Sequence, residues 1–455
     1  GPRLAEYRVF CACWALAGVA RLTLMQAEQP SWFVPNLLVL LSGVGLVIYG
    51  GRLFWLVSAA GLLGPVLFLG DWLTQSLLMG VTACVGIVVT SRHSTGRALL
   101  AASAGLTCAT YVAAAFHKLN SGFLSPEASC ANELLPRLAA HFGSGSIAQG
   151  LHDLGAWPGW PLTAISAELL VVVLVFLRPR VGLIFALLFH LPLTVAYAPV
   201  FVFATLPGLM AAVLLSGPLP TIHKSTARSV VVLASCGALS TVVLVTALAL
   251  GYRDEWTMYP KVWLLMALTA AAIGVPGGWG KPMWQVGRRP GGIALLAFLV
   301  ALSWASTPYW ANNLQHAGAM LSNLRIDRPC WNHLLVPRPA SDDGYVRIEH
   351  ASLGDPSLPP GELREELTRR ERVLLDQLWS PGAMLRVREN WCVNSARPIR
   401  ISGTYRGRPF ESQDWCAEDA GVLAPSGVFG GDAWFPNYLR YQKNLTRSCE
   451  QVCLH

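Results

Sequence analysis

Long apolar runs constrain this chain more than any other feature of its sequence. Runs of about 16 to 22 residues recur from residue 7 to residue 307, and a helix needs roughly 20 apolar residues to cross a bilayer. We count eleven, at 7–25, 32–49, 53–69, 73–91, 98–116, 161–177, 181–197, 200–216, 229–250, 260–277 and 291–307. Only 13% of the residues are charged, against about 25% in soluble domains. The sequence therefore predicts an α-helical integral membrane bundle of about eleven transmembrane helices.

The basic residues give this bundle an orientation. With the N-terminus inside, twelve basic residues fall in one set of loops and five in the opposite set, and basic loops stay on the cytoplasmic side. The tail from residue 308 onward holds 17 basic and 17 acidic residues, so the net charge of +8 belongs to the membrane part. We expect a multi-pass protein with a cytoplasmic N-terminus and a C-terminal domain in the periplasm or lumen. The bilayer explains the charge, and no nucleic acid partner is needed.

The composition changes abruptly near residue 308, which predicts two domains. Residues 1–307 form the membrane domain, with a long outer loop at 119–160, and residues 308–455 form a small extracytoplasmic α+β domain. In this second domain an amphipathic helix is expected at Glu362–Leu378 and strands at 344–349, 384–388 and 398–402. Within the outer loop, Glu133–Phe142 has apolar residues at helical spacing. This helix either roofs a membrane cavity or is an ordinary packed loop helix.

Six cysteines lie on the side predicted to be outside the cytoplasm. They are Cys130 in the outer loop and Cys330, Cys392, Cys416, Cys449 and Cys453 in the tail. An oxidising compartment allows disulfides among them, although the sequence leaves their connectivity open. Zinc binding needs paired cysteines at short spacing, and no pair has the CxxC spacing. We therefore expect disulfides and no metal.

Three ionisable residues interrupt the apolar runs. Glu168 and His190 fall inside predicted spans, where such groups are costly and usually mark a site or pathway. Lys118 ends a span in a chain that has only five lysines against 29 arginines. A lysine amine removed from water can lose its proton and act as a base, which an arginine cannot do. For Glu168 and His190 the alternative is a hydrogen-bonded core residue, and for Lys118 it is a lysine whose ammonium reaches water at the membrane surface.

The segment Phe116-His-Lys-Leu-Asn-Ser-Gly-Phe-Leu124 resembles the vitamin K-dependent γ-glutamyl carboxylases and their bacterial relatives, the HTTM family. In that family a lysine is followed by a leucine and an acidic or amide residue, and the lysine is the proposed base that deprotonates reduced vitamin K. Lys118 falls on this position. Leu188-Phe-His-Leu191 is similar to a Phe-His pair of the family, and residues 320–336 resemble the stretch that begins its outer domain.

Two departures from the family concern its catalytic residues. After Asp71 and Trp72, Gln75 stands where the carboxylases have a histidine thought to assist catalysis. Glutamine donates and accepts hydrogen bonds but does not exchange a proton near neutral pH. The stretch that handles the glutamate substrate after the family's tryptophan is also missing, because Trp331 is followed by Asn332 and His333. The resemblance therefore covers the residue expected to deprotonate the cofactor better than the residues expected to recognise a peptide glutamate.

The resemblance implies a lyase-type membrane enzyme that couples quinone epoxidation to carboxylation of a secreted peptide, a protein or another carbon acid. The implied cofactor is reduced vitamin K or another quinol, with oxygen and carbon dioxide as co-substrates. The expected catalytic residues are Lys118, His190 and Gln75. The expected cofactor-binding residues are His117, Asn120, Glu168 and Trp72. The expected substrate-binding residues are Asn323, Arg325, Trp331, Asn332 and His333.

Two other functions fit the sequence. A non-carboxylating relative of the same membrane fold would aid maturation or export of a secreted peptide, which suits the missing glutamate-site residues. A transporter or lipid-binding membrane protein would use Glu168 and His190 to line a pathway. A peptide substrate encoded next to the gene would favour the first two functions over the third, and dependence on a reduced quinone separates the carboxylase from the non-carboxylating relative.

Overall fold

Two compact units make up the chain in the computed structural model. Unit 1 comprises Gly1–Phe116 and Ala131–Trp304, and unit 2 comprises His117–Cys130 and Ala305–Leu454. The structure describes residues 2–25, 33–68, 74–90, 96–140, 145–196, 201–217, 281–310, 322–338, 345–352, 362–379, 384, 387–388, 391–392, 399–405, 408–416 and 445–449.

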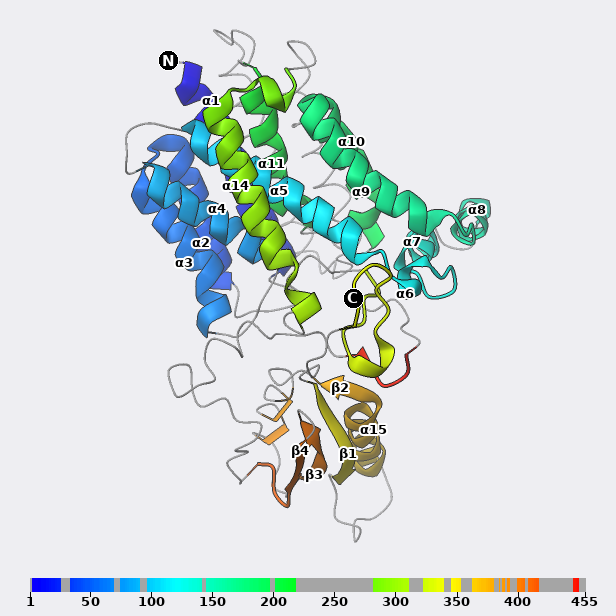
Figure 1. The fold of residues 1–455 in the computed structure, drawn as a ribbon. Helices are drawn as coiled ribbons and strands as arrows, with labels where there is room; N and C mark the ends of the chain where they lie inside the picture. The colour runs from blue at the N-terminus through cyan, green and yellow to red at the C-terminus, as the bar shows by residue number, and fades with distance from the viewer. Residues whose placement is uncertain are drawn as a thin grey trace. The chain divides into compact units, whose positions relative to one another are not determined.

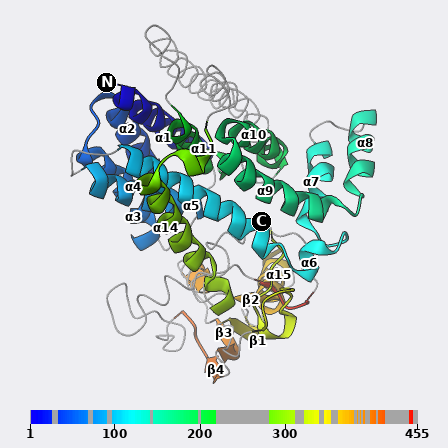
Figure 2. The same ribbon diagram turned by 45° about the horizontal axis from the view of Figure 1, so that its top comes forward.

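Helices and short connections form unit 1 in its described residues (Figure 1). The α-helices are α1 (Pro2–Met25), α2 (Phe33–Ile48), α3 (Arg52–Phe68), α4 (Thr74–Thr90), α5 (Gly96–His117), α7 (Cys130–Ala139), α8 (Ser146–Gly155), α9 (Trp160–Leu177), α10 (Pro179–Ala196), α11 (Phe201–Ser216) and α14 (Arg288–Ala305). A short 3-10 helix, η3, covers Met283–Gln285. Helices adjacent in sequence pack against each other from α1 to α4, and α9 and α10 form a hairpin (Figures 1 and 2).

Apolar and aromatic side chains fill the core of unit 1. The indole rings of Trp14 and Trp55 meet edge to face with their centroids 5.0 Å apart, the geometry that aromatic quadrupoles favour. Their polar atoms have partners, since Trp14 Nε1 donates to Ser58 Oγ at 3.1 Å and Trp55 Nε1 to the Tyr7 hydroxyl at 2.9 Å. The two indole nitrogens are therefore hydrogen-bonded within the core.

Nine of the eleven predicted spans coincide with described helices, and 229–250 and 260–277 lie outside the described residues. Three of the described helices are long and apolar enough to cross a membrane, at Gly96–His117, Trp160–Leu177 and Arg288–Tyr309. Others are shorter: α2 and α11 have 16 residues each, about 24 Å at 1.5 Å per residue, less than the roughly 30 Å of a hydrocarbon core. The described residues therefore show a mostly helical protein with three helices that could cross a membrane, and they do not support a count of eleven.

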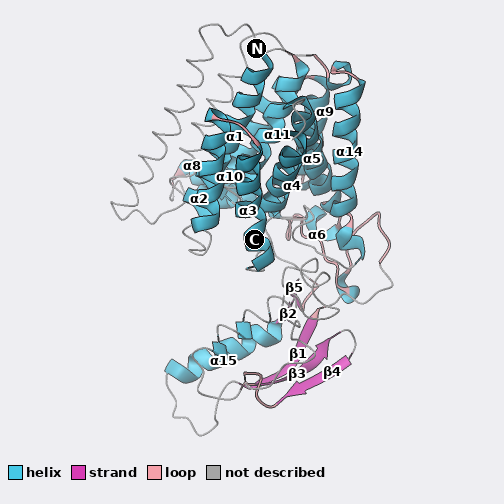
Figure 3. Cartoon of the chain, turned by 90° about the vertical axis from the view of Figure 1, so that its left-hand side faces the viewer, coloured by secondary structure: helices cyan, strands magenta, loops and turns pink. Residues whose placement is uncertain are grey.

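Unit 2 carries a small antiparallel sheet in the order β4-β3-β1-β2-β5 (Figure 3). Its elements are η4 (Thr307–Trp310), α6 (Ser121–Leu124), η5 (Arg328–Cys330), β1 (Val346–Ser352), α15 (Glu362–Asp376), β2 (Gln377–Trp379), β3 (Arg400–Tyr405), β4 (Arg408–Ser412) and β5 (Leu445–Thr446). Helix α15 packs on β1, where Leu374 joins Val346 and Ile348 in a fully buried core. The expected α+β character of the C-terminal region is confirmed.

Two local predictions in this region were wrong. The helix predicted to reach Leu378 ends at Asp376, because Leu378 enters β2 and pairs with Arg347 on one side and Leu445 on the other. The described residues of the strand predicted at 384–388 are helical instead. Met384 and Val387 both pack on the sheet core, and residues three apart share a face of a helix.

Disulfides link described cysteines of the tail, as the sequence predicts. Cys330 pairs with Cys449 and Cys392 with Cys416, and Cys130 is also disulfide-bonded. The first pair closes a separation of 119 residues and the second one of 24. Disulfides of this kind persist in oxidising compartments.

Candidate functional site

Lys118 directly follows the last residue of α5, and its side chain is only 6% exposed. Its Nζ lies 5.7 Å from the centroid of the Phe123 ring, within the range of a cation–π contact. Phe123 itself is buried. The amine that the sequence singles out is thus removed from water and rests against an aromatic ring.

Asn120 holds the turn that contains Lys118. It is the N-cap of α6, where its Oδ1 accepts from Phe123 N at 2.8 Å. Its Nδ2 donates to the carbonyls of His117 and Ser322, at 2.7 and 2.6 Å. Both amide hydrogens are therefore donated within the protein and the oxygen accepts there too, which makes Asn120 a structural residue of the turn.

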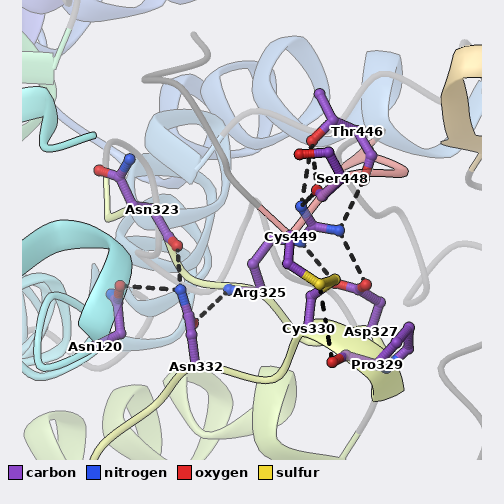
Figure 4. A network of polar contacts seen from close by, with 10 residues as sticks. All are labelled: Asn120, Asn323, Arg325, Asp327, Pro329, Cys330, Asn332, Thr446, Ser448 and Cys449. Atoms are coloured by element: carbon purple, nitrogen blue, oxygen red, sulfur yellow. Dashed lines mark hydrogen bonds and ion pairs between the residues drawn. A yellow bond between two sulfur atoms is a disulfide. The ribbon is translucent and has the colours of Figure 1, made fainter. Parts of the chain in front are cut away.

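A second segment pairs with this turn. Asn120 and His333 form an antiparallel bridge, with Ser121 N donating to Asn332 O and Leu334 N to Leu119 O, each at 3.0 Å. The Asn332 side chain reinforces the pairing, because its Nδ2 donates to Asn120 Oδ1 at 3.2 Å and to Asn323 O at 2.9 Å (Figure 4). Residues 212 apart in sequence thus fix the backbone beside Lys118.

Asn323 adds a third connection in unit 2. Its φ of 53° is in the left-handed region, which asparagine tolerates better than most residues. Its side chain contacts the segment between α6 and α7, donating to Ala128 O at 2.8 Å and accepting from Cys130 N at 3.2 Å. The predicted substrate-binding residues Asn323 and Asn332 therefore both hold main chain in place.

Arg325 is fully buried, and all five of its N–H donors are used. It forms a bidentate ion pair with Asp327, at 2.7 Å from Nε to Oδ1 and 2.9 Å from Nη2 to Oδ2. The other three hydrogens go to Thr446 Oγ1, Thr446 O and Ser448 O, at 3.2, 2.8 and 2.7 Å (Figure 4). No donor is left for a substrate, so in this structure the guanidinium joins two segments of the protein.

Two histidines meet at Tyr309 in unit 2. The Nδ1 of His117 lies 2.7 Å from the Tyr309 hydroxyl, and the His333 ring packs edge-on to Tyr309 with centroids 4.9 Å apart. His333 Nδ1 accepts from Leu335 N and Val336 N at 3.1 and 3.0 Å, which places its neutral-state proton on Nε2. Trp331 also contacts Tyr309 and donates from Nε1 to Val336 O at 3.0 Å.

In unit 1, Glu168 and His190 belong to one polar cluster. The Tyr111 hydroxyl lies 2.7 Å from His190 Nε2, next to Thr205 and within electrostatic range of the Glu168 carboxylate. All four side chains are buried and come from α5, α9, α10 and α11. We call Tyr111, Glu168, His190 and Thr205 the polar cluster.

The two remaining predicted site residues are Gln75 and Trp72. Gln75 is in the first turn of α4, and Trp72 lies outside the described residues. The neighbouring Ser76 is buried and accepts a hydrogen bond at 2.9 Å from Arg21 Nη2, which is also buried. The predicted roles of Gln75 and Trp72 stay predictions.

The sequence did not reveal Tyr111 and Tyr309 as site residues. The Tyr111 hydroxyl contacts His190, and the Tyr309 hydroxyl contacts His117. A signal existed for Tyr111, because a tyrosine inside an apolar span carries a hydroxyl that needs a partner when buried. Comparison of the chain with models of protein families, with curated proteins and with solved structures finds no match. The assignment of chemistry therefore depends on the residues themselves.

Proposed function

We propose that the protein is a vitamin K-dependent carboxylase-like, multi-pass membrane enzyme in which Lys118 is the base that activates a reduced quinone. The proposal includes the cytoplasmic N-terminus, the extracytoplasmic C-terminal domain and the eleven spans expected from the sequence. The observation that carries it is the burial of Lys118, 6% exposed, in a turn that Asn120 holds by four hydrogen bonds.

Burial distinguishes a base from a membrane anchor. An anchoring lysine extends its ammonium into water, whereas the Lys118 amine lies over the ring of Phe123. Lysines that serve as bases in enzymes are those removed from water. The environment of Lys118 therefore favours the catalytic interpretation over the anchor.

In the proposed reaction, Nζ of Lys118 accepts the proton of a quinol O–H and becomes an ammonium. When bound, the quinol would supply reducing power: over one turnover, quinol and oxygen give quinone epoxide and water, while a substrate C–H and carbon dioxide give a carboxylate and a proton. The protein holds the amine in place, keeps water from it and returns its proton. Water exclusion is the expected use of a buried turn.

Purified protein tests the proposal through epoxide formation from reduced vitamin K or menaquinol. We expect Lys118→Ala to abolish turnover, and Lys118→Arg to abolish it as well, because arginine keeps the positive charge but cannot act as a base. Lys281→Ala is the matched control, since Lys281 is described and exposed. Each variant is first shown to be folded by its thermal unfolding. Turnover retained by Lys118→Arg would rule out Lys118 as the base.

A second candidate is a non-carboxylating relative that aids maturation or export of a secreted peptide. Arg325, Asn332 and Asn323, expected to contact a glutamate substrate, spend their side-chain hydrogens on the protein itself. This favours a protein that lacks the glutamate half of the chemistry. Absence of quinol oxidation, together with no incorporation of labelled carbon dioxide into any secreted peptide, would select this candidate.

A further inference from the structure

Helix α8 leaves large apolar side chains exposed along one side. Ile147 and Leu154 are 63% and 52% exposed, and the half-buried Leu151 lies between them in sequence. These three residues share one side of the helix, because residues three or four apart are neighbours on its surface. We call Ile147, Leu151 and Leu154 the apolar face of α8. A contiguous apolar patch of this kind marks an interaction surface.

A second side of α8 is packed against α7. Ala148 and Gly155 on this side are buried, and a Cβ added to Gly155 would lie 2.5 Å from Cδ of Pro136 on α7. Asn132, also on α7, donates from Nδ2 to Gly155 O and to Trp157 O, at 2.9 Å each. Helix α7 therefore holds α8 in one orientation and leaves its apolar face uncovered.

The remaining side of α8 is polar. It consists of Ser146, Gln149, His152 and Asp153, which are all exposed, and Gln149 Nε2 donates to Asp153 Oδ1 at 2.9 Å. We call these four residues the polar face of α8. The ten residues of α8 include no lysine or arginine. A membrane would therefore hold this helix by apolar contact and not by attraction to anionic head groups.

Helix α9, which follows α8 after residues 156–159, is one of the described helices long and apolar enough to cross a membrane. Its large exposed side chains are apolar from the first turn to the last, namely Leu162, Leu169, Leu170, Val173, Phe176 and Leu177. Acyl chains cover such a surface when the helix crosses a bilayer. Helix α8 does not continue along the axis of α9 (Figures 1 and 2), so its apolar face begins where the span ends.

Two tryptophans mark the junction of α8 and α9. Trp157 is 51% exposed, and its ring meets that of Trp160 edge to face with centroids 5.6 Å apart. Trp160 Nε1 donates to Leu154 O at 2.6 Å, which ties the last turn of α8 to the first residue of α9. Tryptophan is enriched where a membrane meets water. The pair therefore places that boundary at the N-terminal end of α9.

We propose that α8 lies in the membrane–water interface beside the N-terminal end of α9, with its apolar face on the acyl chains and its polar face in water. The lipid bilayer is the partner of the apolar face, because that face adjoins the lipid-covered side of a membrane-crossing helix. The interfacial helix of the loop at 119–160 is then α8, and α7 is the packed helix that supports it. This placement goes beyond the proposed function and requires only that α9 crosses the membrane.

Spin labels on the full-length protein in phosphatidylcholine vesicles test the placement. A nitroxide is attached to Ile147→Cys or Leu154→Cys on the apolar face, and to Gln149→Cys or Asp153→Cys as matched controls on the polar face. Cys84→Ser is the common background, because Cys84 is an exposed free cysteine. The same background without an added cysteine supplies the blank. Leu169→Cys, 43% exposed near the middle of α9, reports the membrane interior.

The measurement is the ratio of collision rates with oxygen, which concentrates in lipid, and with a water-soluble nickel chelate. We expect this ratio to be at least about threefold higher on the apolar face than on the polar face, because an interfacial helix buries its apolar side about 5–10 Å deep. Leu169→Cys should give a higher ratio still. All labelled positions are exposed in the structure, so each variant should fold, and its thermal unfolding is compared with that of the background.

Three results would overturn the placement. Equal ratios on the two faces would put both in water. Low collision rates with both reagents at positions 147 and 154 would mean that protein covers the apolar face, as in a dimer of this chain. Ratios there equal to that of Leu169→Cys would put α8 inside the hydrocarbon. The labels report without any quinol, so a failed epoxide assay leaves the placement standing, and water-exposed labels leave the proposed function untouched.

Discussion

Two buried polar groups in this protein use their side chains in opposite ways. In unit 2 the Arg325 network comprises Asn120, Asn323, Arg325, Asp327, Asn332, Thr446 and Ser448. Its amide and guanidinium hydrogens are donated to carbonyls, one carboxylate and one hydroxyl (Figure 4). In unit 1 the polar cluster combines a phenol, an imidazole, a carboxylic acid and a hydroxyl, three of which exchange protons.

The chemical type of the side chains distinguishes a structural network from a reactive cluster better than their burial does. Arg325 and Asp327 at the centre of the network are as buried as the four members of the polar cluster, so burial alone does not rank the two groups. Amides and guanidinium groups do not titrate near neutral pH and serve to fix a geometry, whereas imidazole and carboxylic acid can change state within it. Mutations in the Arg325 network should therefore lower the free energy of unfolding strongly, and mutations in the polar cluster should lower it only slightly.

The largest expected loss follows removal of the Arg325 side chain. Arg325→Ala leaves the Asp327 carboxylate buried without its ion pair and should lower the free energy of unfolding by about 3–5 kcal/mol. Urea denaturation in detergent, followed by pulse proteolysis, measures the change. Arg137→Ala is the matched control, because its ion pair with Glu133 is 39% and 31% exposed and should contribute less than about 1 kcal/mol. Equal losses would contradict a structural Arg325.

Loss of the Cys330–Cys449 disulfide should come next. The double serine variant is expected to unfold more easily by about 2–4 kcal/mol, because the link constrains a long stretch of the unfolded chain. Removing Cys392–Cys416, which spans 24 residues instead of 119, should cost about 1 kcal/mol less on the same argument. The same denaturation assay compares the two. A greater loss for the shorter link would show that chain entropy does not set their contributions.

A smaller loss is expected from Asn120→Ala. The variant removes the cap of α6 and leaves the carbonyls of His117 and Ser322 without their donor, which should cost about 2 kcal/mol. Ser125→Ala is the control in the same segment, since Ser125 only donates to the exposed Glu127. If Asn120→Ala lost epoxide formation but no stability, Asn120 would contact the quinone, as the sequence resemblance implies, and would not merely hold the turn.

The smallest change in stability is expected in the polar cluster. Tyr111→Phe keeps the ring and deletes the hydroxyl 2.7 Å from His190, for about 1 kcal/mol or less. Thermal unfolding in detergent should barely shift, while the pH dependence of turnover should change because His190 has lost a hydrogen-bond partner. A drop of the size expected for Arg325→Ala would place the cluster among the structural networks and remove the contrast between the units.

The sequence predicts the helices much better than it predicts the contacts between them. An apolar run such as 161–177 becomes α9 almost residue for residue, because local hydrophobicity decides it. The pairing of Tyr111 with His190 spans 79 residues and depends on how four helices rotate against each other. Nothing in the spacing of Glu168 or His190 specifies that rotation.

The family resemblance also points to residues of unit 2 but does not predict their roles. The resemblance implies substrate contacts at Arg325 and Asn332, whereas in the structure the side-chain hydrogens of both are donated to the protein itself. Asp327 and Thr446, which accept hydrogens of Arg325, drew no attention because a surface ion pair or a threonine is common in any tail. Burial of a charged pair is a tertiary property, and one sequence does not disclose it.

The connection from Arg325 to Thr446 and Ser448 has a consequence for biogenesis. As the chain leaves the ribosome, α5 and Lys118 emerge more than 300 residues before the partners of Arg325. The segment that braces the lysine turn through Asn332 is thus secured only when residues 446–449 have been made and Cys449 has met Cys330. Until then the turn that contains Lys118 lacks the support that this segment gives it, so the backbone around Lys118 is completed only late in synthesis.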